Sequence, residues 1–113
     1  MTGITSHVLD TSAGRPAVGL TVRLEQPGPG TGAAAPLASA TTDGDGRIRD
    51  WLPAGVPAGR YRLVFETGGW FRASGRETLY PEVIIDFEVQ DGVEAYHLPL
   101  LLAPFGYSTY RGS

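Results

Sequence analysis

Apolar and polar residues alternate along several short stretches of the chain, and this period of two predicts β-strands that bury one face. The alternation is clearest in residues 20–25, 60–66 and 83–90. Charged residues occupy positions between the apolar ones, as expected for a sheet with one face in solvent. The expected inward-facing residues are Leu20, Val22 and Leu24 in the first stretch, Tyr61, Leu63 and Phe65 in the second, and Val83, Ile85, Phe87 and Val89 in the third.

Three other stretches predict strands whose placement is less fully defined. Residues 4–9 carry apolar and polar side chains on both faces, so the pattern does not decide which face is buried. Residues 93–102 follow the turn signal Asp91-Gly92 and are expected to form an antiparallel hairpin with the preceding strand. Pro99 interrupts this stretch, which places it either at a sheet edge or at a bulge. Aromatic spacing in residues 105–113 predicts one more short strand.

Glycine and proline separate these stretches from one another. The chain holds 16 Gly and 9 Pro, without a repeat. Residues 27–36 are too rich in both for regular structure, and we interpret them as a mobile connection. Residues 37–42 then enter Asp43-Gly-Asp-Gly46, where glycine adopts positive φ easily. A hairpin-like reversal into residues 47–49 is therefore expected.

One segment, residues 67–75, has the features of a helix. Thr67 is the candidate N-cap, Gly75 is the candidate stop, and two early glycines keep the helix short. Short strands with Gly/Pro turns are typical of an all-β sandwich. A chain of this length buries roughly 65% of the surface that it exposes when unfolded, which is enough for a core. We therefore expect a single domain over residues 1–113.

Composition and charge exclude several classes of protein. With 42% hydrophobic and 19% charged residues, the chain is neither disordered nor fibrous. Its net charge of -3, without a cluster of basic residues, argues against nucleic acid or an anionic membrane as a partner. The absence of cysteine excludes disulfides and thiolate chemistry. No stretch approaches the ~20 apolar residues of a membrane span or resembles a signal peptide, so a cytoplasmic protein is expected.

Few residues stand out as candidates for catalysis. The chain has only two histidines, His7 and His97, and each lies in a predicted strand. A lone histidine in a strand is more often structural or exposed than catalytic. Two histidines are too few for a catalytic zinc site unless a carboxylate joins them, so no metal is expected. Arg47 follows a turn, where an arginine is by itself typical of a surface charge.

Several segments have distinctive sequences: Ile4-Thr-Ser-His-Val-Leu-Asp-Thr-Ser12, Gly14-Arg-Pro-Ala17, Thr42-Asp-Gly-Asp-Gly-Arg47, Tyr96-His-Leu-Pro-Leu-Leu-Leu102 and Tyr107-Ser-Thr-Tyr-Arg-Gly-Ser113. Together they resemble the transthyretin-like 5-hydroxyisourate hydrolases, over essentially the whole chain. The most specific part is the closing Tyr110-Arg-Gly-Ser113, which members with the enzyme activity keep and the hormone carrier transthyretin lacks. Ala95 departs from the pattern, because many relatives place another histidine there.

The resemblance implies a hydrolase of urate degradation. Its reaction opens the six-membered ring of 5-hydroxyisourate to give 2-oxo-4-hydroxy-4-carboxy-5-ureidoimidazoline, without a cofactor or metal. The family's catalytic positions fall on His7, Arg47, His97 and Ser113. One histidine would activate or orient water and the other would position the substrate, in either order, while Arg47 binds the planar ring and stabilises charge. The implied substrate-binding residues are His7, Arg47, Tyr110, Arg111 and Gly112.

The resemblance also implies an architecture and an assembly. The fold would be a two-sheet antiparallel β-sandwich of seven or eight strands with one short helix. Four copies would form a homotetramer, a dimer of dimers, with residues of two subunits around each site. Two alternatives stay open: a non-catalytic carrier of small aromatic ligands, which would line its channel with apolar groups, and a prealbumin-like accessory module, which needs neither His97 nor the terminal tetrapeptide.

Overall fold

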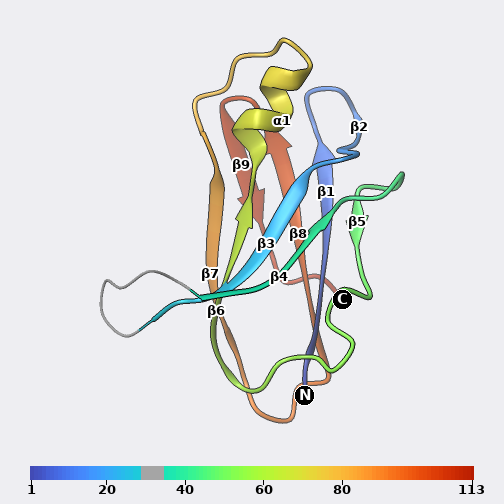
Figure 1. The fold of residues 1–113 in the computed structure, drawn as a ribbon. Helices are drawn as coiled ribbons and strands as arrows, with labels where there is room; N and C mark the ends of the chain where they lie inside the picture. Colours follow the sequence, from blue (N-terminus) through green and yellow to red (C-terminus); the bar gives the residue numbers. More distant parts are fainter. Residues whose placement is uncertain (29–34) are drawn as a thin grey trace.

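In the computed structural model, which describes residues 1–28 and 35–113, two β-sheets pack face to face and one short helix lies at an end of the sandwich (Figure 1). One sheet has the order β2-β1-β8-β9, with β5 also paired to β1, and the other has the order β4-β3-β6-β7. The predicted two-sheet sandwich with a short helix is confirmed. The described residues form nine strands where seven or eight were expected, two of them only two residues long, and one pair, β1 with β8, is parallel. The elements are β1 (Gly3–Asp10), β2 (Arg15–Pro16), β3 (Thr21–Gln26), β4 (Ala35–Thr41), β5 (Arg47–Ile48), β6 (Gly59–Phe65), α1 (Thr67–Ala73), β7 (Val83–Val89), β8 (Ala95–Ala103) and β9 (Gly106–Thr109).

The core lies between the sheets and is built from the alternating apolar residues that the sequence predicts. Leu20, Val22 and Leu24 are fully buried in and beside β3, and Leu63 and Phe65 are fully buried in β6. Each such side chain contributes about 1.5–3 kcal/mol relative to an exposed one. The strands that carry this alternation therefore form the rigid support on which the outer surfaces of the sheets are held.

β1 buries one face, and this settles the assignment that the sequence leaves open. Ile4, Ser6 and Val8 point into the core, whereas Thr5 and His7 are half-buried on the opposite face. The hydroxyl of Ser6 donates to the carbonyl of Leu98 at 2.7 Å, so this buried polar group is satisfied within the sheet. The histidine of β1 consequently lies on the outer face of the five-stranded sheet.

The expected hairpin between residues 83–90 and 93–102 is wrong. β7 is an edge strand of the four-stranded sheet, whereas β8 belongs to the five-stranded sheet. There β8 runs parallel to β1, in a register that extends from Gly3 opposite Ala95 to Asp10 opposite Leu102. The turn at Asp91-Gly92 reverses the chain, but turn chemistry does not choose the sheet that the next strand joins.

The hairpin-like reversal at Asp43-Gly-Asp-Gly46 forms, but it also joins the two sheets. The amide of Gly46 donates to the carbonyl of Asp43 at 2.9 Å, and the Asp43 carboxylate accepts bonds from the amides of Asp45 and Arg47. The flanking strands do not pair with each other, because β4 pairs with β3 and β5 pairs with β1. This crossing brings Arg47 next to His7.

Pro99 marks neither an edge strand nor a bulge in β8, which corrects that expectation. β8 lies between β1 and β9, and its pairs with both are continuous. The carbonyls of His97 and Pro99 accept bonds from the Gly112 amide and the Thr109 hydroxyl, so both residues direct their backbone groups toward β9. β9 ends at Thr109, and the tail pairs with β8 again only at Gly112. Pro99 lies opposite this gap, so its missing N–H costs no hydrogen bond between the strands.

The short helix is confirmed, but its start differs from the prediction. Its N-cap residue is Glu66, which makes no side-chain capping bond, and Thr67 is fully buried inside the first turn. Gly75 does end the helix: its φ is 74°, and its amide bonds to the carbonyl of Arg72 while that of Arg76 bonds to Phe71. Within the described residues, no helix is long and apolar enough to cross a membrane.

The connection predicted over residues 27–36 lies mostly outside the described part of the chain, which omits 29–34. Its end is a strand rather than an irregular segment, since β4 begins at Ala35. Pro36 is tolerated there because β4 is at the edge of its sheet, and the pairing with β3 shifts register between Leu24 and Glu25.

Candidate active site

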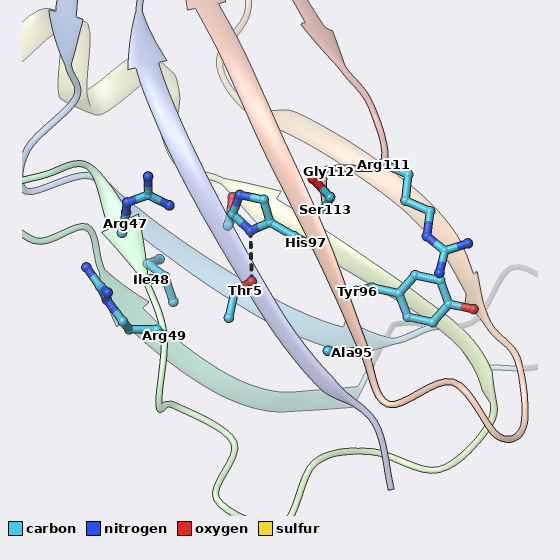
Figure 2. A pocket seen from close by; sticks show the side chains of 11 residues that line it. Thr5, Arg47, Ile48, Arg49, Ala95, Tyr96, His97, Arg111, Gly112 and Ser113 are labelled. Carbon is cyan, nitrogen blue, oxygen red and sulfur yellow. Dashed lines mark hydrogen bonds between the residues drawn. The ribbon is translucent and has the colours of Figure 1, made fainter.

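The outer face of the five-stranded sheet brings together the polar residues that the sequence singles out. Thr5 lies opposite His97 in the β1–β8 pair, and His7 lies opposite Arg47 in the β1–β5 pair. Paired residues of a sheet project to the same face, so all four side chains lie on the side away from the core. Beside them is a cavity of about 450 Å³. It is lined by Thr5, Ser6, Arg47, Ile48, Arg49, Ala95, Tyr96, His97, Arg111, Gly112 and Ser113 (Figure 2).

Neighbouring groups hold the ring of His97 and disfavour its charged form. Its Nδ1 lies 2.8 Å from the hydroxyl of Thr5 (Figure 2). Partial burial, together with the positive charge of Arg47 and the proximity of His7, holds the pKa of His97 below its usual value of 6.5. Each of these influences disfavours the imidazolium. His97 is therefore a neutral imidazole at neutral pH, with a nitrogen able to accept a proton.

His7 is held by a backbone carbonyl from the neighbouring turn. Its Nε2 lies 2.9 Å from the carbonyl oxygen of Asp45. A carbonyl oxygen can only accept, so Nε2 carries the proton and the neutral ring keeps its lone pair on Nδ1. The cavity-lining residues do not include His7, which lies two residues further along β1 than Thr5, beside Arg47.

The C-terminal tail lies against His97. The amide of Gly112 donates to the carbonyl of His97 at 2.7 Å. A Cβ at position 112 would lie 2.6 Å from Cδ2 of the His97 ring, closer than real Cβ contacts allow, and 3.2 Å from Cγ of Pro99, which is a tight contact. Glycine is thus required for the tail to approach the ring. This approach places Ser113 at the cavity.

The other two residues of the terminal tetrapeptide lie further from the histidines. Arg111 lines the cavity, but its guanidinium carbon lies 4.6 Å from the centre of the Tyr96 ring, and Figure 2 shows it turned away from His97. Tyr110 is 56% exposed and is not among the lining residues. Their contact with a substrate stays a prediction.

Several cavity residues were not among the site residues expected from the sequence, and Arg49 and Thr5 are two of them. Arg49 lies 3.6 Å from the Asp43 carboxylate and 4.0 Å from that of Asp45, so its charge is shared with the turn. The spacing of Arg47 and Arg49 was visible in the sequence. Thr5 was not detectable, because its importance depends on the parallel pairing that sets it beside His97.

The arrangement combines a neutral imidazole, a permanently charged guanidinium and the Ser113 hydroxyl around one cavity. Such groups can bind a planar ring rich in carbonyl and N–H groups, stabilise a developing oxyanion and accept a proton from water. Within the described residues, no group of three or more His, Cys, Asp or Glu side chains could hold a metal ion.

Comparison with known proteins defines the family. The model of the HIUase/Transthyretin family matches residues 4–112, and the chain belongs to this family. A curated relative from Caulobacter vibrioides, named 5-hydroxyisourate hydrolase, is 43% identical over 118 aligned positions that cover 100% of both chains. Relatives with the same name occur in organisms as distant as Mus musculus, at 39% identity over 97% of this chain and 94% of that one.

Solved structures from both branches of the family have the same fold. A 5-hydroxyisourate hydrolase from Klebsiella pneumoniae superposes with a TM-score of 0.87 at 45% identity, covering 98% of this chain and 99% of that one. A transthyretin from Sparus aurata superposes with a TM-score of 0.89 at 28% identity, covering 97% and 96%. The fold is thus shared by both, and sequence identity is higher to the hydrolase.

Proposed function

We propose that this protein is a 5-hydroxyisourate hydrolase. The observation that carries the proposal is the cluster of His97, Arg47 and the C-terminal Ser113 around one cavity on the outer face of the sheet. Support also comes from the shared name of the relatives in several taxa. The reaction adds water across an amide-type C–N bond of the six-membered ring, which leaves a carboxylate and a ureido group.

The proposed chemistry assigns one task to each kind of side chain. Water must lose a proton as it attacks, the carbonyl oxygen must be stabilised as it becomes negative, and the leaving nitrogen must gain a proton. His97 takes the proton from water, since its lowered pKa keeps it neutral. Arg47 binds the ring and stabilises the oxyanion through its fixed fork of donors.

His7 and the tail orient the substrate in this scheme. His7, anchored through Nε2 to Asp45, offers the lone pair of its Nδ1 to an N–H of the substrate. The proton that His97 takes from water then passes from the His97 imidazolium to the leaving nitrogen. The Ser113 hydroxyl can accept and donate hydrogen bonds at the cavity, and the bond from the Gly112 amide holds this segment there. Tyr110 and Arg111 contact substrate only after a change of position or from a neighbouring subunit.

We propose that the working form is a homotetramer, a dimer of dimers, built from one domain of residues 1–113. The site lies on the outer face of a sheet, with no layer of the described chain packed over it. A second copy placed over this face would enclose the substrate and exclude water from the ring, which strengthens the electrostatic interactions there.

The direct experiment compares the wild-type protein with His97→Asn, both with an untagged C-terminus. The ultraviolet decay of 5-hydroxyisourate, freshly generated by urate oxidase, should be faster with the wild type than in buffer. The rate that the protein adds should fall by roughly 10²–10⁴-fold in the variant. Gly69→Ala in α1, where a Cβ meets nothing within 4 Å, is the matched control and should behave as the wild type. Saturable substrate binding without decay would instead indicate a carrier.

A further inference from the structure

Thr5 contacts the ring of His97 on the edge that faces away from the tail. The two residues are direct partners in the parallel β1–β8 pair, and the hydroxyl of Thr5 lies 2.8 Å from Nδ1 of His97. Within the described part of the chain, Thr5 is the only hydrogen-bond partner of this ring. Thr5 itself lines the cavity. The contact therefore determines how the imidazole is presented to a ligand.

The opposite side of the ring is fixed by the tail. The backbone of Gly112 packs against Cδ2 of His97, and the Gly112 amide is bonded to the His97 carbonyl. With Cδ2 covered and Nδ1 bonded to Thr5, Nε2 is the ring nitrogen available to a ligand. Figure 2 shows Nε2 turned away from Thr5, toward the side of the cavity where Arg47 lies.

A neutral histidine has two tautomers, and a threonine hydroxyl can pair with either one. If the hydroxyl donates to Nδ1, the proton of the ring sits on Nε2, and the imidazole cannot accept a proton from water. If Nδ1–H donates to the hydroxyl, Nε2 keeps its lone pair. The positive charge of Arg47 favours a lone pair over an N–H on the ring edge that faces it. His7, the second group whose charge acts on the ring, is anchored to Asp45 and adds no negative charge.

We propose that Thr5 is a positioning residue that accepts a hydrogen bond from Nδ1–H of His97 and so keeps the lone pair of His97 on Nε2, facing the cavity. This role rests on the proposed function, because the lone pair matters as the acceptor of a proton from water. When Nε2 takes that proton, Nδ1–H stays bonded to Thr5. The hydroxyl thus serves both the neutral imidazole and the imidazolium without a rearrangement.

The test reads the tautomer of His97 in the full protein labelled with ¹⁵N-histidine. Long-range ¹H–¹⁵N correlations distinguish a protonated from a bare ring nitrogen, and His97→Asn assigns the signals. The wild type should show Nδ1–H and a bare Nε2. Thr5→Val keeps the branched shape but lacks the hydroxyl, and it should raise the share of Nε2–H. Thr5→Ser should restore the wild-type tautomer.

Kinetics supply the second readout. Thr5→Val should lower kcat about 10-fold, equivalent to about 1.4 kcal/mol, with a much smaller change in KM. Thr21→Val, a half-buried threonine of β3 in the other sheet, is the matched control and should change neither readout. Wild-type His97 found as Nε2–H, or a tautomer that Thr5→Val leaves unchanged, would overturn the role of Thr5. Because the spectrum needs no substrate, a shifted tautomer without hydrolysis in any variant would reject the proposed function and leave the positioning of His97 intact.

Discussion

Single residues at the site are fixed by contacts from opposite sides. His97 is bonded to Thr5 through its ring and to Gly112 through its backbone carbonyl, and it sits close to the charge of Arg47. Arg47 in turn is held beside His7 by the pairing of β5 with β1. The local chemistry follows from these contacts, because they hold a histidine neutral next to a cation.

The pH dependence of activity should reflect this neutral histidine. Burial, Arg47 and His7 lower the pKa of His97 below 6.5, so its lone pair is lost only at a pH below that value. The acid limb of kcat/KM, which reports the free enzyme, should therefore lie below pH 6.5. A pH series of initial rates checks this. An acid limb at or above pH 6.5 would show that His97 is not the group that accepts the proton.

Gly112→Ala should separate activity from folding. The added Cβ would lie 2.6 Å from the His97 ring, so either the ring or the tail must move. We expect kcat/KM to fall by about 10²-fold, as for a small misplacement of catalytic groups, with the unfolding midpoint nearly unchanged at this terminal position. Kinetic assays and urea unfolding measure the two effects. Unchanged kcat/KM in a folded Gly112→Ala protein would remove the tail from the site.

Strands and turns show how far the sequence predicts this protein. Alternation assigned the inward residues of β3, β6 and β7 because each strand has one face in the core. It left β1 open because that strand carries the polar Ser6 toward the core and the apolar Leu9 outward, against the usual polarity. Pairing partners were mispredicted at Asp91-Gly92, since the turn does not specify which sheet receives β8.

The site residues were likewise predicted only in part. His7, Arg47 and His97 were found through the family resemblance, whereas the residues alone favoured structural or surface roles for them. Thr5 could not be found, because its contact with His97 joins positions 92 residues apart through a parallel pair. Sequence patterns report burial along one strand, and they do not report the register between distant strands.

At the scale of elements, an ion pair ties the end of β1 to the segment after α1. Asp10 is 2% exposed, and its carboxylate accepts a bond of 2.8 Å from Arg76, whose guanidinium lies over the rings of Trp70 and Phe71. Burial opposes the ionisation of Asp10, but the bonds from Arg76, Ser12 and the Ala13 amide outweigh it, so its pKa lies below the ordinary value of 3.8.

Asp10→Asn should therefore destabilise the fold in a pH-dependent way. A lowered carboxyl pKa contributes stability that is present above pH 3.8 and is lost as the pH falls through the folded-state pKa. We expect a loss of about 1–3 kcal/mol at pH 7, which shrinks as the pH falls below 3.8. Urea unfolding at pH 7 and at a pH below 3.8 measures this loss of stability, with the exposed Asp91→Asn as the control. A loss independent of pH would contradict the ion pair.

The whole molecule combines a closed core with an open site. Apolar side chains fill the space between the sheets, whereas the cavity lies on an outer face. Exposed apolar residues also occur on two edge strands, with Ile84 on β7 and Tyr107 on β9 at 49% and 43% exposure. Unpaired strand edges with such residues favour association with other chains.

Activity should therefore depend on assembly. If the proposed tetramer completes the site, specific activity should fall on dilution in proportion to the fraction of tetramer measured by mass photometry. An inert carrier protein controls for adsorption to surfaces. Full activity in a population shown to be monomeric would mean that one chain suffices.

The measurement that tests the central claim most directly is the time course of ultraviolet decay of fresh 5-hydroxyisourate with a substoichiometric amount of untagged wild-type protein. The outer-face site predicts that many substrate molecules per subunit are converted to the ring-opened carboxylate, faster than in buffer alone. Decay at the buffer rate, or consumption of only one equivalent per subunit by a folded protein, would contradict it.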